Sequence, residues 1–508
     1  MTSKRLELLV FTAILAVYGG LAFYRLADYP PFWYDDITVA QAPIELVTTG
    51  IFPRIYTVPW YVHQFLMSGF LKVFGLGVIQ IKLASVFMGG VLILAAYLVA
   101  KKLFSVAVAL IATSFLIVDP FFFQTSRWGR SDITAVALFM LSLYFFLRMR
   151  EGKSSLLFAA LSALALGGSI FSHENGLFLG VPVMFVLLVW TYGRSFLKQR
   201  QFWVFSSTLA LVAVPYLVYV ARDLSNFQSQ IVFFISSAGK EMGGYVFYHQ
   251  PLISLFSGEI SERWRLYIEN YSLILALYVM GVVGGLLKRD ASSKLLVTVV
   301  IIIQLLFIFI KKNNFYLVWM TPLLCMLLAS LFVDVFNRAT EGSRGRLTAT
   351  IRSNRFAVLA AAFLGFVFLF SLFFRLGVTT LHSDSYDAIS SQLNAAIPAQ
   401  AKVLGPGPFW LALHDRDFRP YGAAASYAVE KRNTGQDFTL AQATTAVMND
   451  FKPDYVIYEE NDLPTNVPIK AALKDFVASG KYVKVSTIAG GWHYGDIELW
   501  KVNHGAAR

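Results

Sequence analysis

Long apolar stretches alternate with short polar segments along the first three quarters of the chain. Eleven of them have the length of about 17 to 22 residues that crosses the hydrocarbon core of a bilayer. They begin near Leu6, Ile81, Ser105, Ile133, Ser155, Leu177, Phe202, Tyr271, Leu295, Phe315 and Phe356. The pattern predicts a polytopic α-helical membrane protein, with about 11 transmembrane helices in residues 1–375.

A different pattern follows the first apolar stretch. Beyond the adjacent carboxylates Asp35 and Asp36, apolar residues recur at helical spacing from Ile37 to Val47, and the run ends at Gly50. This spacing predicts an amphipathic helix that lies along the membrane surface and begins at the two carboxylates.

The last quarter of the chain changes character. Short β-prone runs begin at Ala401, Asp454, Tyr482 and Asp496, and helix-like stretches lie near Leu440 and Ile469. Residues 376–508 are therefore expected to form a small soluble α/β domain of ordinary domain size.

Composition supports the membrane assignment. Of the 508 residues, 56% are hydrophobic and only 15% are charged, which is far more apolar than a soluble domain. The lone cysteine, Cys325, falls inside a predicted span, so neither a disulfide framework nor a thiolate metal site is expected.

The distribution of charge predicts the orientation. The net charge is +12, and the basic residues concentrate in short segments at one end of the predicted spans, such as Lys101–Lys102 and Arg148–Arg150. By the positive-inside rule these segments are cytoplasmic, which places the long loops 25–80 and 221–270 and the C-terminal domain outside. We expect an integral protein of the plasma (inner) membrane, and the charge indicates topology rather than a nucleic-acid partner.

The cytoplasmic segments are too short for a nucleotide-binding domain, so any chemistry is expected on the extracytoplasmic face. Ionisable and polar side chains recur there at predicted helix ends: Asp35, Asp36, Arg127, Arg130, Asp132, His173, Glu174, Arg263, Lys312 and Tyr316. Cations suit a lipid-linked phosphate, and a carboxylate suits activation of an acceptor hydroxyl. The alternative for each is a solvated turn, a helix cap or an interfacial anchor.

Two observations bear on these alternatives. A helix N-cap accounts for one of the paired carboxylates but leaves the other without a role. No carboxylate lies in the middle of a predicted span, where ion-coupled transporters usually keep such groups.

Four segments resemble the GT-C glycosyltransferases that use polyprenyl-phosphate sugars, in particular protein O-mannosyltransferases and the aminoarabinose transferases of lipid A. They are WYDDITVAQA, the segment that opens with VPWYVHQF, DPFFFQTSRWGRSDITAVALF and NNFYLVWMTPLLCMLLA. The resemblance extends over residues 6–335, although Asp36 stands where many relatives have Glu.

The resemblance implies a role for each matched residue. Asp35 would be the catalytic carboxylate and Asp36 its acidic neighbour. The donor-binding or phosphate-binding residues would be Arg127, Arg130, Asp132, Lys312 and Tyr316, and possible further site residues are His63, His173, Glu174 and Arg263.

The expected activity is inverting transfer of a sugar from a polyprenyl-phosphate donor to a hydroxyl of a lipid, glycan or protein acceptor, with an Asp general base. The alternatives are a lipid-linked oligosaccharide ligase or polymerase, and a lipid or sugar transporter without chemistry. No metal is required, because the leaving group already carries its phosphate, but Mg²⁺ or Mn²⁺ could bind at the Asp pair.

Overall fold

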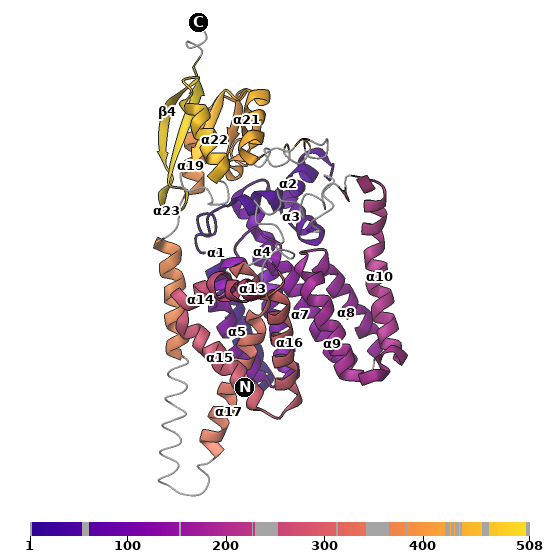
Figure 1. Ribbon diagram of the computed structural model, residues 1–508. Helices are drawn as coiled ribbons and strands as arrows, with labels where there is room; N and C mark the ends of the chain where they lie inside the picture. The colour runs from indigo at the N-terminus through magenta and orange to yellow at the C-terminus, as the bar shows by residue number, and fades with distance from the viewer. Residues whose placement is uncertain are drawn as a thin grey trace.

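The computed structural model divides into a helical body, two helices above it and a small C-terminal domain (Figure 1). It describes residues 3–52, 60–151, 154–225, 227–228, 252–310, 313–341, 365–381, 385–421, 439–459 and 467–503, together with residues 427, 431 and 436. Of the predicted features, Lys312, parts of both long outer loops and the start of the span expected near Phe356 lie outside these residues.

The helices of the first half are α1 (Ser3–Phe23), α2 (Tyr34–Thr49), α3 (Tyr61–Phe74), α4 (Val78–Leu103), α5 (Val106–Val118), α6 (Pro120–Thr125), α7 (Asp132–Met149), α8 (Ser155–Ile170), η1 (Gly176–Gly180), α9 (Val181–Tyr192), η2 (Gly193–Lys198) and α10 (Arg200–Ala221). They are followed by α13 (Leu252–Gly258), η3 (Glu259–Arg263), α14 (Arg265–Asn270), α15 (Ser272–Leu287), α16 (Ala291–Phe307), η4 (Asn314–Trp319), α17 (Thr321–Glu341) and a helix over residues 365–381.

Helices long and apolar enough to cross a membrane occur where the hydropathy pattern places them. Among the described residues, seven meet this criterion, and four shorter apolar helices (α5, α8, α15 and α16) stand at four of the other predicted positions. The chain is thus mostly helical with a membrane-protein composition. One boundary differs from the prediction, because the stretch expected to begin near Phe315 first forms η4 and becomes α-helical only at Thr321.

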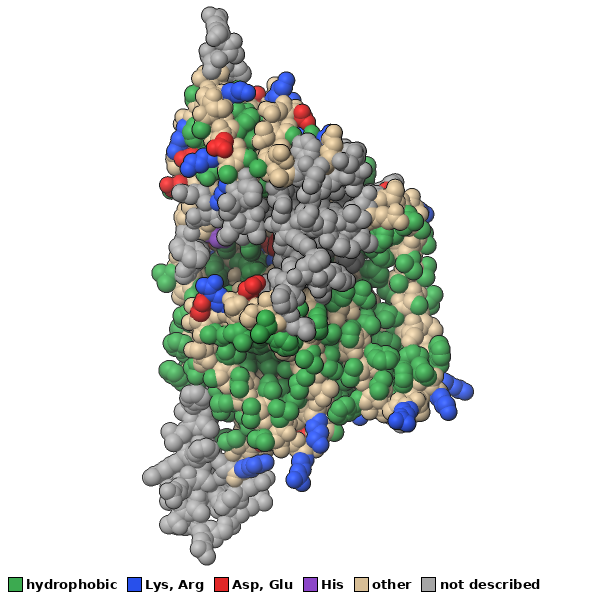
Figure 2. All heavy atoms as spheres, in the orientation of Figure 1, with side chains coloured by type: hydrophobic (Ala, Val, Ile, Leu, Met, Phe, Trp, Pro, Cys, Tyr) green, Lys and Arg blue, Asp and Glu red, His purple; other side chains and the backbone are tan. Residues whose placement is uncertain are grey.

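On the face of the helical body shown in Figure 2, apolar side chains form a broad belt, and charged ones lie on the C-terminal domain and at the two ends of the body. At the end that carries the predicted cytoplasmic segments, Lys101 pairs with Glu7 and Lys102 pairs with Glu151. An apolar belt between two charged ends is the surface that a bilayer requires.

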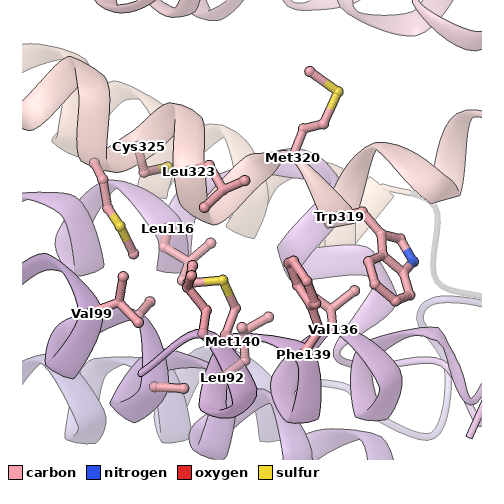
Figure 3. Packing of buried hydrophobic residues seen from close by; sticks show 14 of the residues in the cluster. Leu92, Val99, Leu116, Val136, Phe139, Met140, Trp319, Met320, Leu323 and Cys325 are labelled. Atoms are coloured by element: carbon pink, nitrogen blue, oxygen red, sulfur yellow. The ribbon is translucent and has the colours of Figure 1, made fainter. Parts of the chain in front are cut away.

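The core of the helical body joins α4, α5, α7 and α17. Figure 3 shows Leu92, Leu116, Phe139 and Met140 packed against residues of α17 and of the segment before it, Trp319 and Leu323 among them. Small residues allow some helices to approach closely, as is usual between membrane helices. A Cβ added at Gly281 of α15 would lie 2.8 Å from the backbone nitrogen of Leu328 in α17.

The C-terminal domain is a mixed α/β domain, as predicted. Its elements are α19 (Tyr386–Ala396), β1 (Lys402–Gly405), η5 (Gly407–Trp410), β2 (Asp417–Pro420), α21 (Leu440–Phe451), β3 (Tyr455–Glu459), α22 (Val467–Ala478), β4 (Tyr482–Ala489), α23 (Gly491–Tyr494) and β5 (Asp496–Val502). The strand order is β2-β1-β3-β5-β4, with β1 parallel to β2 and β3, and β5 antiparallel to β3 and β4.

The predicted amphipathic helix is α2, which ends at Gly50 in the left-handed conformation. Together with α3 it lies between the helical body and the C-terminal sheet (Figure 1). One buried cluster joins apolar residues of both helices, such as Ile37 and Met67, to residues of the C-terminal domain, such as Tyr386 and Phe409. The segment that carries Asp35 and Asp36 is therefore packed from both sides.

The close approach of α15 and α17 gives a test of the packing. We expect Gly281→Ala to lower the free energy of unfolding by about 1–3 kcal/mol, because the backbone of Leu328 cannot move aside as a flexible side chain would. Gly20→Ala in α1 is the control, since its Cβ would meet nothing within 4 Å and alanine favours the helix by up to about 1 kcal/mol. Thermal unfolding in detergent would measure both, and equal stability of the two variants would contradict the packing.

Candidate functional site

The carboxylate of Asp36 is fully buried and accepts hydrogen bonds from backbone N–H groups. Its Oδ2 accepts a hydrogen bond from the backbone N–H of Trp33 at 2.9 Å, which satisfies a donor at the start of α2. Its Oδ1 accepts one from the backbone N–H of Gly129 at 2.8 Å, in the turn before α7. Burial raises the pKa of Asp36 to about 6, against the opposing effects of Lys82, the Trp33 hydrogen bond and Arg130. Asp36 thus joins two segments of the chain that are 93 residues apart.

The neighbouring carboxylate is placed differently. The Asp35 side chain is 48% exposed, and its Oδ2 lies 2.5 Å from Nη1 of Arg130. It accepts no backbone hydrogen bond in the described structure. The two adjacent acids therefore divide their roles: Asp36 fixes the start of the helix, and Asp35 presents an accessible, oriented carboxylate.

Arg130 lies between two carboxylates. Its Nε donates to Oδ2 of Asp132 at 2.9 Å while its Nη1 pairs with Asp35. The guanidinium also lies 5.8 Å from the ring centroid of Trp128 and 5.3 Å from that of Phe315. Burial lowers the pKa of Arg130, but Asp132 and Asp35 more than compensate and hold it above its ordinary value. Arg130 is therefore a permanent positive charge beside Asp35.

His173 extends this chain of charged groups. Its Nε2 lies 3.3 Å from Oδ1 of Asp132, and its Nδ1 lies 3.3 Å from Oε2 of Glu174. The backbone N–H of Asn175 donates to Nδ1 at 3.1 Å, while Nε2 faces Asp132. The imidazole meets the ring of Tyr316 edge to face, with centroids 5.4 Å apart. The structure thus brings together six of the residues that the sequence analysis singled out: Asp35, Arg130, Asp132, His173, Glu174 and Tyr316.

Two buried cations hold the loop that precedes the site. Nη2 of Arg127 donates to the backbone carbonyls of Tyr24 and Tyr29, the latter at 2.8 Å. Nζ of Lys82 donates to those of Leu26 at 2.8 Å and Pro30 at 2.5 Å. Arg127 therefore braces the loop, and its predicted contact with the donor phosphate stays a prediction. Sequence analysis missed Lys82, although a lysine within an apolar span is a recognised signal of such a role.

Arg263 anchors the segment that leads to Tyr316. It is fully buried, its Nε pairs with Glu259, and its two terminal nitrogens donate to the carbonyls of Phe307, Ile310 and Asn313 at 3.0–3.1 Å. Asn313 follows Lys312 in the sequence. Arg263 thus shapes the chain on both sides of the predicted phosphate-binding lysine.

His63, which belongs to α3, contacts α7 close to the start of that helix. It is fully buried, and its Nδ1 is 2.8 Å from Oγ1 of Thr134. Burial lowers the pKa of His63 to about 4, so the ring is neutral at pH 7. These contacts do not extend to Asp35.

Asp119, between α5 and α6, is a buried carboxylate that sequence analysis did not single out. Its Oδ1 accepts the backbone N–H groups of Phe121 and Phe122, and its Oδ2 accepts the hydroxyls of Tyr267 and Tyr278 at 2.6 and 2.7 Å. Four donors occupy this carboxylate. It therefore joins helices together and does not resemble the open intramembrane acids of ion-coupled transporters.

The geometry does not favour the divalent cation that the sequence analysis gave as an option at the Asp pair. Both oxygens of Asp36 already accept backbone N–H groups, and Asp35 is paired with Arg130, so the two carboxylates do not converge on one point. Among the described residues, no group of three or more His, Cys, Asp or Glu side chains is arranged to hold a metal ion.

The sequence and the fold were compared with known proteins. Residues 58–219 match the sequence model of a family described as dolichyl-phosphate-mannose-protein mannosyltransferase. No curated protein is significantly similar in sequence.

Several solved structures share the fold along most of the chain. The crystal structure of ArnT from Cupriavidus metallidurans, bound to undecaprenyl phosphate, matches with a TM-score of 0.63 at 14% identity, covering 99% of each chain. The archaeal oligosaccharyltransferase AglB from Archaeoglobus fulgidus, in complex with an inhibitory peptide and a dolichol-phosphate, matches with a TM-score of 0.59 at 13% identity, covering 90% of this chain and 69% of that one.

A further structure of the Archaeoglobus fulgidus oligosaccharyltransferase, in complex with Zn and sulfate, has a TM-score of 0.57 at 13% identity and covers 96% of this chain and 72% of that one. The predicted resemblance to GT-C glycosyltransferases is therefore confirmed. At these identities the structures show the shared fold, and the roles of individual residues remain predictions.

The different surroundings of the two acids predict different costs of substitution. In Asp36→Asn the amide replaces one of two acceptors by a donor, which would face a backbone N–H, so we expect a loss of about 1–3 kcal/mol in the free energy of unfolding at pH 7. Asp35→Asn should cost less than about 1 kcal/mol, because Asp35 is half exposed. Unfolding in detergent would compare them, and a larger loss for Asp35→Asn would contradict the assignment.

Asp36 also predicts a dependence of stability on pH. Because its native pKa is about 6, against an ordinary value of 3.8, the native state between about pH 4 and 6 holds a proton that the unfolded chain has lost. This contribution is present at low pH and is lost as the pH rises through 6. We expect the difference in unfolding free energy between wild type and Asp36→Asn to fall by about 1–3 kcal/mol from pH 4 to pH 7. A difference that does not change with pH would contradict the raised pKa.

Proposed function

We propose that this protein transfers a sugar from a polyprenyl-phosphate-linked donor to an acceptor hydroxyl on the extracytoplasmic face of the membrane, with inversion at the anomeric carbon and Asp35 as general base. The observation that carries the proposal is the asymmetry of the acidic pair. Asp36 is fully buried with both oxygens occupied, whereas Asp35 is 48% exposed and held by a permanent cation. A general base must be reachable by the proton that it removes.

The reaction needs one proton acceptor and one stabilised leaving group. As the acceptor oxygen bonds to the anomeric carbon, Asp35 takes the hydroxyl proton, and the bond between that carbon and the phosphate oxygen breaks on the opposite face. The electron pair stays with the departing polyprenyl phosphate. One displacement from the opposite face inverts the configuration, and no covalent sugar-enzyme intermediate forms.

Arg130 has two tasks in this proposal. Its Nη1 pairs with Oδ2 of Asp35 and so holds the carboxylate in one orientation. A guanidinium presents five N–H groups, and the two carboxylates use only those on Nε and Nη1, so Nη2 retains donors for a phosphate oxygen. Arg130 can thus contact the donor while it remains paired with the base.

The aromatic side chains around the pair suit the sugar. Trp128 and Phe315 meet edge to face with centroids 4.3 Å apart, and Trp33 lies 6.0 Å from Trp128. Binding sites for small molecules are typically apolar and aromatic surfaces with a few polar groups that fix orientation. We assign the leaving phosphate to Lys312 and Tyr316, on the segment that Arg263 anchors, in addition to Arg130.

The orientation of the protein rests on its charge distribution. With the basic segments in the cytoplasm, the carboxylate pair and the C-terminal domain face outward from the plasma (inner) membrane. Lipid-linked phosphate sugars are donors that a membrane-bound site can reach there without soluble nucleotides. The family description names dolichyl-phosphate-mannose, and the ArnT and AglB structures contain undecaprenyl phosphate and dolichol-phosphate, which supports the donor class.

A donor panel tests the proposal. Purified protein in liposomes would receive labelled polyprenyl-phosphate sugars, with membrane extract as the source of acceptor, and release of polyprenyl phosphate would be followed. We expect one donor to be consumed, and Asp35→Asn to lower kcat by about 100-fold or more because the proton acceptor is lost. Asp290→Asn is the matched control: Asp290 caps α16 through the backbone N–H of Ser293, outside the site, and the folded variant should keep the rate of wild type within about twofold.

Three results would decide against parts of this assignment. Full activity of Asp35→Asn would remove Asp35 as the base. Movement of the label across the bilayer without a new glycosidic bond would indicate a transporter. Transfer of preassembled oligosaccharides, with no use of single sugars, would indicate a ligase or polymerase.

A further inference from the structure

The peptide group between Phe32 and Trp33 is held at both ends. Its carbonyl oxygen accepts a hydrogen bond from the hydroxyl of Tyr494 at 2.8 Å, and its N–H donates to Oδ2 of Asp36 at 2.9 Å. Tyr494 belongs to the C-terminal domain and is 462 residues from Phe32 in the sequence. The candidate base, Asp35, follows this peptide within the first turn of α2.

The side chain of Phe32 is inserted into the core of the C-terminal domain. It is fully buried and meets the ring of Tyr386 edge to face, with centroids 5.3 Å apart. Phe409 stacks on Tyr386 at 6.3 Å and lies 5.8 Å from Tyr494. The domain therefore holds both the side chain and the carbonyl group of Phe32.

Tyr494 is presented by a turn that depends on glycine. Gly491 and Gly495, at either end of the segment, have φ values of +76° and +62°, which residues with a Cβ rarely adopt. The N–H of Gly490 donates to the carbonyl of Gly495 at 2.7 Å, and a Cβ at Gly490 would lie only 2.3 Å from that oxygen. The turn fixes the backbone of Tyr494, and the ring is 1% exposed.

A continuous set of hydrogen bonds connects this turn to the base. Asp36, which binds the N–H of Trp33, also binds the N–H of Gly129, and the next residue is Arg130, the partner of Asp35. Tyr494 and Gly129 thus approach the start of α2 from two different parts of the chain. The orientation of Asp35 depends on both.

We propose that Tyr494 is a positioning residue for the transfer reaction, and that the C-terminal domain completes the active site by fixing the peptide that precedes Asp35. This inference rests on the proposed function of Asp35 as the base. The tyrosine touches no reacting atom. It acts through the Phe32 carbonyl, which sets where the first turn of α2 begins and hence where the carboxylate points.

Tyr494→Phe removes the hydroxyl and keeps the buried ring. We expect kcat to fall about tenfold or more, since small misplacements of a catalytic group are costly, while KM for the donor changes less than about twofold. Tyr482→Phe is the matched control. The hydroxyl of Tyr482 is also buried and donates to a backbone carbonyl, that of Pro453, at 2.8 Å, but the bond lies within the C-terminal domain.

Hydrogen exchange supplies a readout that needs no turnover. In wild type and both variants, mass spectrometry would follow the peptide that contains residues 30–37. We expect faster exchange at the Trp33 amide in Tyr494→Phe alone, because the loss of one anchor loosens the peptide that Asp36 holds from the other side. Thermal unfolding of the two variants would show that their stabilities are comparable.

The outcomes separate this inference from the proposed function. If wild type turns over a donor and Tyr494→Phe keeps its kcat, the positioning role is wrong even though the transferase assignment stands. If wild type uses no donor, the proposed function fails. The rate of hydrogen exchange at the Trp33 amide then tests by itself whether Tyr494 holds the Trp33 peptide. Faster exchange in Tyr494→Phe then supports a positioned Trp33 peptide, and unchanged exchange overturns it. Equal losses of kcat in both variants would also overturn it.

Discussion

The arrangement of the site depends on one buried carboxylate that accepts hydrogen bonds from two backbone N–H groups. Asp36 caps the first turn of α2 through Trp33 and binds Gly129 in the turn before α7, so one side chain sets two segments against each other. A carboxylate without these donors would be costly at 0% exposure. Because successive residues on a helix point about 100° apart, fixing Asp36 inward directs Asp35 toward Arg130 and the accessible side.

The loop before α2 shows how irregular backbone is accommodated next to an apolar body. Buried carbonyl groups need hydrogen-bond donors, and here Arg127 and Lys82, which are distant in sequence, donate to them. Arg263 does the same for the carbonyls that follow α16. Cations near the outer face therefore have two uses, and only the partners in the folded chain distinguish a brace for the backbone from a group that remains available to a ligand.

Much of the fold could be predicted from sequence because the signals are local. Hydropathy located the apolar helices, and short β-prone runs located four of the five strands, whereas β2 gave no signal. The amphipathic helix from Asp35 to Gly50 was confirmed as α2. The partners that distinguish Asp36 from Asp35, Gly129 and Arg130, could not be predicted, and neither could the bond from Tyr494 to Phe32, which spans 462 residues. Such contacts are set by tertiary packing, which leaves no periodic pattern in the sequence.

In the proposed reaction, the base and the leaving phosphate need different electrostatic surroundings. Within the described cluster, Arg130 is shared by Asp35 and Asp132, and Glu174 adds a further carboxylate beside His173, so acidic groups outnumber cations. A phosphate approaching this cluster would be repelled unless further positive charge met it. Lys82 and Nη2 of Arg127 already donate to backbone carbonyls. The segment between α16 and η4, which contains Lys311 and Lys312 and is anchored by Arg263 at Asn313, supplies that charge in the sequence. In the proposed reaction the lysines are therefore assigned to the anionic donor, whereas the accessible carboxylate of Asp35 is assigned to the neutral acceptor hydroxyl.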